Sequence, residues 1–406
     1  MTLDDSKHWS LDTLLAHTGR TPGEHKGAVN PPVYHASTVL FPTVTALEES
    51  VRKRNDPGHF HYGRFGTPTS HALEQALARL EGGDHALVLP SGVAAISTTL
   101  LAHCGPGDHL LMVDSVYGPA RSLCETLLRR LGIETEYYDP RIGAGIARLI
   151  RPNTKLVYLE SPGSLTFEIQ DLPAIAEPAH RQGVAVAIDS TWGTPLFHTP
   201  LALGADLVIH AATKYIVGHA DAMLGAVVMR KDRYLPVRLA ATALGHTVAA
   251  DDCYLALRGL RTLSVRLQRH QETGLTLAKW LQGRPEVARV IHPALPDHPD
   301  HALWQRDFRG AAGLFAVELK PCSRPAVEAM LNGLRLFGMG FSWGGFESLA
   351  LLTDPSHLRD AVPWPAGAGP LLRIHAGLED PADLIADLER GFERLRSVQG
   401  ERDGTA

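Results

Sequence analysis

The chain has 406 residues, of which 44% are hydrophobic and 20% charged, with a formal net charge of −5. This length exceeds one ordinary domain, so we expect two domains with ample apolar residues for a core in each. The negative charge without a basic run excludes the footprint of a nucleic-acid-binding protein, and no apolar run reaches the about 18 residues of a membrane-spanning helix.

Four cysteines lie far apart in the sequence, which is too sparse for a disulfide framework. They are Cys104, Cys124, Cys253 and Cys322. The polar start, MTLDDSK, contains no apolar signal core. These features predict reduced thiols and a cytoplasmic location.

Turn-forming clusters dominate residues 1–62, at 21–23, 30–32 and 56–58. The stretch contains apolar spots such as 39–41 but too few to form its own core. We therefore expect an irregular N-terminal arm that contacts a neighbouring subunit. A disordered tail is the alternative.

The loop after this arm contains Tyr62 and Arg64 on alternate positions between glycines. In an extended chain both side chains would face the same way. A guanidinium and a phenol hydroxyl suit a phosphate, although on this stretch alone a simple loop is favoured.

A strand over 86–89, a tight turn over 90–93 and a helix over 94–102 follow a helix over 71–81. The turn contains Gly92 and Val93, whose backbone N–H groups would point with the helix dipole at an anion. Neither a Walker loop nor the three-glycine dinucleotide fingerprint is present, so a single phosphate fits better. A plain βα turn is the other interpretation.

Strands and helices continue to alternate, which predicts a mostly parallel sheet covered on both faces. The further strands are expected at 110–113, 133–137, 156–160, 184–188 and 207–210. Ligands of such sheets lie beyond the carboxyl ends of the strands. The five candidates that follow predicted strands are Gly92, Tyr117, Ser161, Asp189 and Lys214.

Lys214 follows the apolar run 207–210 and the small residues 211–213. Desolvation there would lower its pKa and leave a partly neutral amine, which can form a Schiff base with an aldehyde. A lysine that reaches solvent is the alternative, since most lysines lie on the surface.

Beyond about residue 255 a long helical pattern runs to Leu281, and a polar loop over 292–301 follows. The histidines of this loop could bind a metal, but a solvated loop is favoured because no helix or strand supports them. A strand is expected over 313–319. Arg373 lies in an apolar strand, where it is either paired or available for a carboxylate ligand.

Five motifs together resemble the cystathionine β-lyases of the pyridoxal-phosphate (PLP)-dependent Cys/Met-metabolism family, over nearly the whole chain. The lysine motif is specific for the family, and the Ser-Trp-Gly-Gly motif indicates the β-lyases. The motifs are YGR at 62–64, ESPGS at 160–164, AATKYIVGH at 211–219, SWGGFES at 342–348 and RIHAGLED at 373–380.

The resemblance implies an α/β protein of PLP-dependent transferase fold type I, which is aspartate aminotransferase-like. A large domain with a mostly parallel sheet would precede a smaller α+β C-terminal domain. The expected units are the arm, 1–62, the PLP-binding domain, 63–256, and the C-terminal domain, 257–406. A homotetramer, a dimer of catalytic dimers, is also implied.

The resemblance further implies roles for the site residues. Lys214 would carry PLP and move protons with Tyr117, which stacks on the ring, while Asp189 would keep the pyridine nitrogen protonated. Other cofactor-binding residues would be Gly92, Val93, Thr191 and Thr213, with Tyr62 and Arg64 from a neighbouring subunit. Substrate would be bound by Arg373, Ser342, Trp343 and Tyr62. No metal is implied.

The implied reaction is cleavage of L-cystathionine to L-homocysteine, pyruvate and ammonia, with cystine and other cysteine S-conjugates as further substrates. A γ-lyase or γ-synthase of the same family is the alternative. A nicotinamide oxidoreductase and an inactive PLP scaffold fit less well. At the distal end of the substrate the chain departs from the family pattern, because Phe65 replaces an Arg and Arg121 or Ser122 replaces an Asp.

Overall fold

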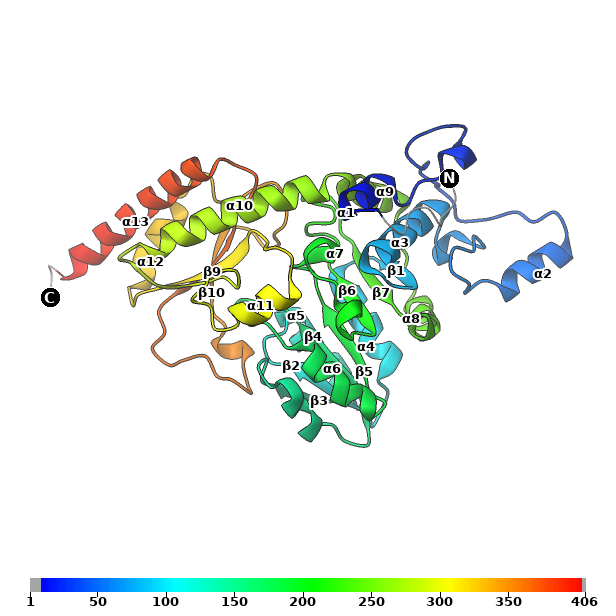
Figure 1. Ribbon diagram of the computed structural model, residues 1–406, viewed down its shortest axis with the longest axis horizontal. Helices are drawn as coiled ribbons and strands as arrows, with labels where there is room; N and C mark the ends of the chain where they lie inside the picture. The colour runs from blue at the N-terminus through cyan, green and yellow to red at the C-terminus, as the bar shows by residue number, and fades with distance from the viewer. Residues whose placement is uncertain (1–8, 404–406) are drawn as a thin grey trace.

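Two sheets organise the computed structural model, which describes residues 9–403 (Figure 1). The larger sheet has seven strands in the order β1-β7-β6-β5-β4-β2-β3. Its strands are β1 (His85–Leu89), β2 (His109–Val113), β3 (Glu134–Tyr138), β4 (Thr154–Glu160), β5 (Ala185–Asp189), β6 (Leu207–His210) and β7 (Gly225–Met229).

Neighbouring strands of this sheet run parallel except around β7, which is antiparallel to both β1 and β6. Strands β2, β5, β6 and β7 are buried along their whole length, as expected for a parallel sheet with helices on both faces. The predicted α/β class with a mostly parallel sheet is confirmed.

The smaller sheet is antiparallel throughout, in the order β10-β11-β9-β8. Its strands are β8 (Val287–Ile291), β9 (Leu314–Leu319), β10 (Leu349–Thr353) and β11 (Leu371–His375). Helices pack against this sheet, as expected for an α+β unit, and they lie at the left of Figure 1.

The helices follow local signals. For example, a capping box formed by Thr67 and Ser70 starts α3, and the helix ends at Glu81, just before Gly82, whose φ is +74°. The α-helices are α1 (Leu11–His17), α2 (Val44–Arg52), α3 (Pro68–Glu81), α4 (Gly92–His103), α5 (Gly118–Leu123), α6 (Leu172–Arg181), α7 (Thr194–Phe197), α8 (Lys231–Ala243), α9 (Ala250–Arg261), α10 (Leu263–Gln282), α11 (His301–Asp307), α12 (Arg324–Asn332) and α13 (Pro381–Asp403).

The structure corrects several local predictions. The arm contains the helices α1 and α2, and α2 projects from the rest of the fold in Figure 1. The Thr43 hydroxyl accepts from the N–H of Ala46 and caps α2, a signal that the turn clusters obscured. Residues 1–8, also assigned to the arm, lie outside the described residues. The long helical pattern after 255 is two helices that break at Thr262.

Strand β7 was not predicted, although its placement shapes the site. A Cβ on Gly225 would lie 2.1 Å from the backbone oxygen of Ser91. Only glycine therefore lets β7 approach the turn between β1 and α4. Strand β10, at the edge of the small sheet, was also missed.

Buried apolar side chains form two clusters, one around the large sheet and one around the small sheet. Helix α10 joins them, because Leu263 and Leu267 belong to the first cluster whereas Leu277 and Leu281 belong to the second. The predicted domain boundaries at 62 and 256 remain predictions, as does the assignment of 404–406, which lie outside the described residues.

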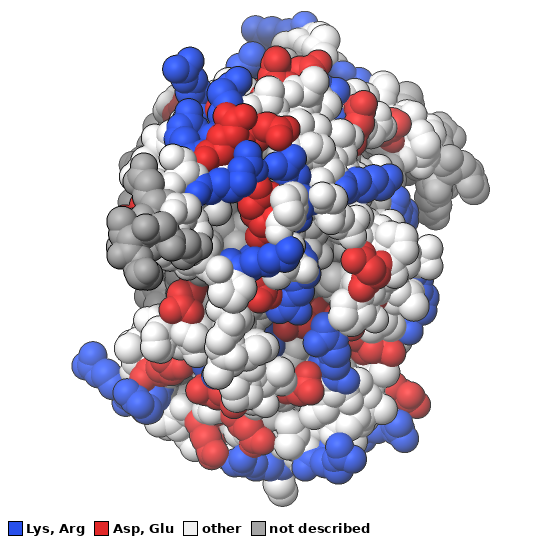
Figure 2. Space-filling view, turned by 90° about the vertical axis from the view of Figure 1, so that its left-hand side faces the viewer, with Lys and Arg blue, Asp and Glu red and all other residues white. Residues whose placement is uncertain are grey.

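The surface carries mixed charge on the face that Figure 2 shows, where Lys and Arg are interspersed with Asp and Glu among the described residues. Among residues 9–403, none of the helices is long and apolar enough to cross a membrane.

Candidate active site

Lys214 lies just beyond the carboxyl end of β6, as predicted, and faces the segment that precedes β10. Its Nζ donates a hydrogen bond to Ser342 Oγ at 2.5 Å and lies 5.5 Å from the centroid of the Trp343 ring. Two segments of the chain that are 128 residues apart therefore meet at this amine.

Burial lowers the pKa of Lys214 to about 8, and the positive charge of Arg373 acts in the same direction. The Asp189 carboxylate opposes this shift. A minor fraction of the amine is therefore neutral near physiological pH, far more than for an ordinary lysine, and a neutral amine is a nucleophile and a base.

Asp189 ends β5 and is buried. Its Oδ1 accepts from both the N–H (2.9 Å) and the hydroxyl (2.6 Å) of Thr191. The same hydroxyl oxygen accepts from the N–H of Ala211, at 2.8 Å, at the end of the neighbouring strand. Because both bonds from the described chain go to Oδ1, Oδ2 keeps its capacity to accept a proton donor.

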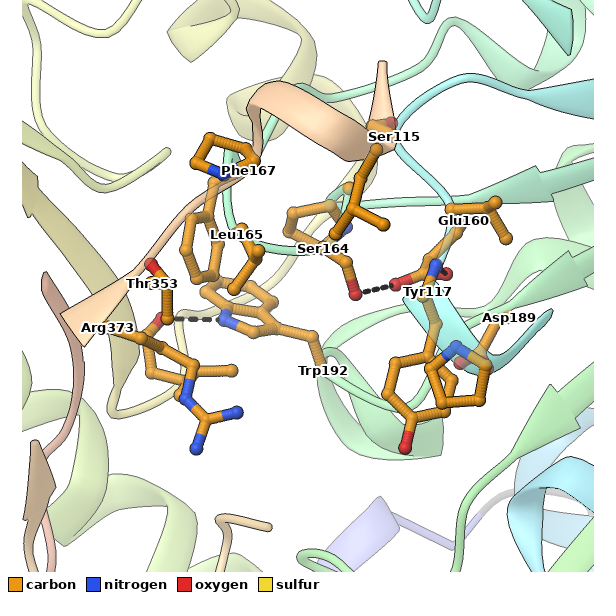
Figure 3. A pocket seen from close by; sticks show the side chains of 18 of the residues that line it. Ser115, Tyr117, Glu160, Ser164, Leu165, Phe167, Asp189, Trp192, Thr353 and Arg373 are labelled. Carbon is orange, nitrogen blue, oxygen red and sulfur yellow. Dashed lines mark hydrogen bonds between the residues drawn. The ribbon is translucent and has the colours of Figure 1, made fainter. Parts of the chain in front are cut away.

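Glu160 is a second buried carboxylate of the site, and sequence reasoning gave it no role. It accepts from the N–H of Tyr117 at 2.7 Å and from the Ser164 hydroxyl at 2.7 Å (Figure 3). Burial and the nearby Asp189 raise the pKa of Glu160. As the last residue of β4, it occupies the same strand-end position as the predicted candidates, and that position was the available signal.

The turn between β1 and α4 forms a backbone cradle. The Ser91 hydroxyl accepts from the N–H of Ala94 and caps α4. The N–H groups of Gly92 and Val93 lie in the first turn, where a helix has no internal acceptor for them. A Cβ on Gly92 would lie 2.6 Å from the Cβ of Ala211, so glycine is required there.

Thr213 is held beside this cradle by hydrogen bonds with Leu224, the residue directly before β7. Its hydroxyl donates to the carbonyl oxygen of Leu224 at 3.1 Å and accepts from the N–H of Leu224 at 2.8 Å. Its own N–H donates to the same carbonyl at 2.9 Å. The side chain is therefore fixed at the edge of the cavity that contains Lys214.

Arg373, on β11, is a candidate for carboxylate binding. One Nη donates to the carbonyl oxygens of Ser342 (2.9 Å) and Gly340 (3.4 Å). Within residues 9–403 it forms no ion pair, because no carboxylate oxygen lies within 4.0 Å of its nitrogens. Ser342 itself has a φ of +79°, which is uncommon for a residue other than glycine and is typical of functional sites.

Two adjoining cavities lie over these residues, one of about 120 Å³ around Lys214 and one of about 380 Å³. Figure 3 shows Arg373 and Tyr117 on opposite sides of the larger cavity. The predicted residues that line them are Gly92, Val93, Tyr117, Asp189, Thr191, Thr213, Lys214, Trp343 and Arg373. Ser161, in contrast, lines neither cavity: it is buried and its hydroxyl oxygen accepts from the N–H of Gln170.

Tyr62 and Arg64 do not line either cavity of their own chain. Arg64 donates instead to the carbonyl oxygen of Thr242 at 3.2 Å. The extended conformation assumed for this loop is wrong, since Gly63–Phe65 forms a 3₁₀ turn. The expected contribution of both side chains to a neighbouring subunit stays a prediction.

The position of Arg121 differs from the expectation that it faces the distal end of a substrate. Its side chain is 3% exposed and pairs with Asp114 and Asp360, each at 2.7 Å. Phe65 is also buried, with the guanidinium of Arg238 over its ring at 5.4 Å. Both side chains are engaged by their own chain, and neither lines the two cavities.

The loop over 292–301 is not solvated as predicted, because His292, His298 and Asp300 are buried. Asp300 pairs with Arg141 at 2.8 Å, and the N–H of Asp300 donates to His298 Nδ1. No group of three or more His, Cys, Asp or Glu within the described part of the chain has a geometry that could hold a metal ion.

Known proteins resemble this chain over most of its length. A family model described as Cys/Met metabolism PLP-dependent enzyme matches residues 12–393. A cystathionine beta-lyase of Bordetella avium is 46% identical over 97% of this chain and 100% of its own length. An L-alanine/L-glutamate racemase of Wolbachia pipientis wMel is 39% identical over 95% of this chain and 97% of its own length.

Among solved structures, metB from Corynebacterium glutamicum matches with a TM-score of 0.88 at 30% sequence identity, covering 96% of this chain and 100% of that chain. This match confirms the predicted type I, aspartate aminotransferase-like fold. The extent of these matches shows that the chain, whose lysine, acid and arginine line two adjoining cavities, belongs to the Cys/Met metabolism PLP-dependent enzyme family.

Proposed function

We propose that the protein is a PLP-dependent carbon–sulfur β-lyase that cleaves L-cystathionine, with water, to L-homocysteine, pyruvate and ammonia. The observation that carries this proposal is the grouping, over two adjoining cavities, of a partly buried lysine with a lowered pKa, Asp189 and a guanidinium without a carboxylate partner in the described chain. The Bordetella avium relative is named for this activity.

The residues present fit PLP. Lys214 would form the Schiff base, and the Asp189 Oδ2 would accept from the pyridine nitrogen. The phosphate would lie at the N-terminus of α4, at the backbone of Gly92 and Val93 and beside Thr213. When bound, PLP supplies an electron sink that stabilises negative charge at the Cα of an amino acid.

Arg373 would bind the α-carboxylate of the substrate, aligned by its bonds to the carbonyl oxygens of Ser342 and Gly340. Trp343, which lies over Lys214 Nζ, would close the same side of the site. With the substrate held there, the Lys214 amine would take the α-proton, because its lowered pKa leaves it partly neutral.

Breakage of the Cβ–Sγ bond requires a proton for the leaving sulfur. Lys214, protonated in the previous step, or the hydroxyl of Tyr117 would donate it. Burial, with Glu160 and Asp189 nearby, raises the pKa of Tyr117, so that its hydroxyl stays protonated and able to donate. The three-carbon enamine that remains hydrolyses to pyruvate and ammonia.

We also propose a cytoplasmic homotetramer built from catalytic dimers. The four cysteines are unpaired, which suits a reducing compartment. Apolar side chains of the arm region are exposed, including Leu40 at 89% and Val44 at 73%, and a second copy would cover them. Mixing a Lys214→Ala chain with an Arg64→Ala chain should restore activity if the site is shared between subunits.

The test of the proposed function is borohydride reduction of the holoenzyme followed by peptide mapping, together with pyruvate release from L-cystathionine. The pyridoxyl label should lie on Lys214, and Lys214→Ala should lose both the label and turnover. Lys279→Ala, which removes an exposed lysine of α10, is the matched control. A label on another lysine contradicts the proposal.

Product analysis separates the alternatives. A γ-lyase or γ-synthase would release a four-carbon keto acid or a new thioether in place of pyruvate. The racemase named among the relatives suggests a second candidate activity, since proton removal and return at Cα needs only Lys214 and an acid on the opposite face. Incubation with L-alanine, followed by chiral analysis, tests it.

A further inference from the structure

The far wall of the larger cavity is apolar. Leu351 and Leu352 come from β10, and Pro355 and Leu358 come from the segment that follows it. Phe341 also lines this cavity, and it is 93% exposed. A substituent that extends from the reacting sulfur away from Lys214 would therefore contact hydrocarbon.

The charged groups of this wall are already paired, beginning with Asp114, which is fully buried. Its Oδ1 accepts from Arg121 at 2.7 Å and from the N–H of Asp360 at 2.8 Å. Its Oδ2 accepts from the N–H of Val362 at 2.9 Å and from Arg359 Nε at 3.2 Å. Four donors occupy this carboxylate, so it has little capacity left for an ammonium group of a ligand.

Arg359 is occupied in the same way. Besides its bond to Asp114, its two terminal nitrogens donate to the Thr166 hydroxyl at 2.7 Å and to the Glu168 carboxylate at 2.9 Å. All three nitrogens of the guanidinium therefore have partners, and its side chain is 4% exposed. These bonds use three of its five N–H groups, and its charge is already balanced by Asp114 and Glu168 in a nearly inaccessible position, so it offers little attraction to a further carboxylate.

The remaining charged groups that line the cavity are Arg373, Glu160 and Asp189. These lie at the end near Lys214, where the proposed function already assigns Arg373 to the α-carboxylate and Asp189 to the cofactor. Within residues 9–403 the far end thus offers no unpaired charge. A distal ammonium and carboxylate would lose hydration there without compensation.

We infer that the preferred substrates, given the proposed function on which this inference rests, are cysteine thioethers whose sulfur carries an uncharged, apolar substituent of about the size of a benzyl group. For S-benzyl-L-cysteine the Cβ–Sγ bond breaks, the sulfur takes a proton and leaves as the thiol, and water converts the three-carbon remainder to pyruvate and ammonia. No oxidant or reductant is needed.

The experiment compares kcat/KM of the holoenzyme for S-benzyl-L-cysteine, S-ethyl-L-cysteine and L-cystathionine, measured as pyruvate release. A well-fitted apolar group is worth about tenfold or more in a hydrophobic pocket. We expect S-benzyl-L-cysteine to exceed L-cystathionine by at least about tenfold, with S-ethyl-L-cysteine below the benzyl compound. A smaller ratio overturns the inference, and a cation supplied to this wall by a neighbouring copy would produce that result.

A pair of variants locates the preference at this wall. Leu358→Arg places a cation among the apolar side chains, so we expect it to lower kcat/KM for S-benzyl-L-cysteine and to raise kcat/KM for L-cystathionine. The ratio of the first kcat/KM to the second should fall at least about tenfold. His357→Arg adds the same charge at the preceding, exposed position, which does not line the cavity, and should leave the ratio unchanged. An equal effect of both variants contradicts the assignment to this wall.

The outcomes also separate this inference from the proposed function. Absence of pyruvate from all three thioethers would refute the lyase itself. Pyruvate from all three with a preference for L-cystathionine would leave the lyase standing and overturn only the assignment of the apolar wall. The comparison on the unmodified holoenzyme needs no variant to fold.

Discussion

Lys214 Nζ donates to the Ser342 hydroxyl at 2.5 Å, which joins the end of β6 to the segment before β10. The amine lies near the Trp343 ring, and partial burial together with the positive charge of Arg373 lowers the pKa of Lys214 to about 8, against the opposing effect of the Asp189 carboxylate. The reactivity of the lysine is therefore decided by groups that the tertiary fold brings to it.

The first prediction concerns the pH dependence of cofactor uptake by the apoenzyme. Only the neutral amine attacks an aldehyde, and its fraction grows as pH rises through the pKa of Lys214, which is about 8. Stopped-flow absorbance should therefore show an uptake rate that rises with a midpoint near pH 8. Because Arg373 lowers this pKa, Arg373→Leu should move the midpoint upward. A wild-type midpoint near the 10.5 of an ordinary lysine would contradict the burial argument.

The second prediction concerns substrate capture. Arg373→Lys keeps the charge but loses the planar fork that binds a carboxylate with two bonds. A charge-assisted hydrogen bond is worth about 1.5–3 kcal/mol, so we expect KM to rise by roughly tenfold to a hundredfold with a smaller change in kcat. Steady-state kinetics with L-cystathionine measures both constants. An unchanged KM would remove Arg373 from the substrate site.

The third prediction concerns the buried ion cluster of Asp114, Arg359 and Glu168. Arg359→Leu would leave two buried carboxylates without this cation, and breaking a buried pair costs about 3–5 kcal/mol. Urea unfolding should show a loss of this size in the free energy of unfolding. Arg324→Leu breaks an exposed pair with Glu328 and should cost at most about 1 kcal/mol. Equal losses would show that burial of the cluster contributes nothing.

The fourth prediction concerns Gly344, which has a φ of +86° and lies against the backbone of Lys214. A Cβ there would be 2.9 Å from the backbone nitrogen of Tyr215 and 3.1 Å from the Cα of Lys214. We expect Gly344→Ala to displace the lysine and lower kcat/KM by about a hundredfold, since catalysis is sensitive to misplacement of about 1 Å.

Gly367 provides the matched control for this prediction. Its φ is +81°, but no atom lies within 4 Å of a Cβ built on it. Gly367→Ala should therefore cost about 1–2 kcal/mol of stability through the backbone conformation, and leave kcat/KM unchanged. If both variants lose activity equally, the close approach at Gly344 is not the cause.

Local patterns in the sequence were enough to predict the centre of the large sheet. Apolar runs such as 184–188 and 207–210 coincide with β5 and β6, which are buried along their length because helices cover both faces of the parallel sheet. The end of each run then marks the carboxyl edge of the sheet, which is how Asp189 and Lys214 were identified. The family motifs added the identity of the cofactor and the expected role of Arg373.

Tertiary structure decided what no local pattern contains. The antiparallel insertion of β7, the role of Glu160 in holding the N–H of Tyr117, and the burial of Arg121 each depend on residues distant in the sequence. The apolar wall from β10 also depends on distant residues. The packing of one sheet against the other decides which side of this edge strand faces the cavity. Periodicity and turn chemistry act over a few residues, whereas the partners of a buried charge are chosen by the whole chain.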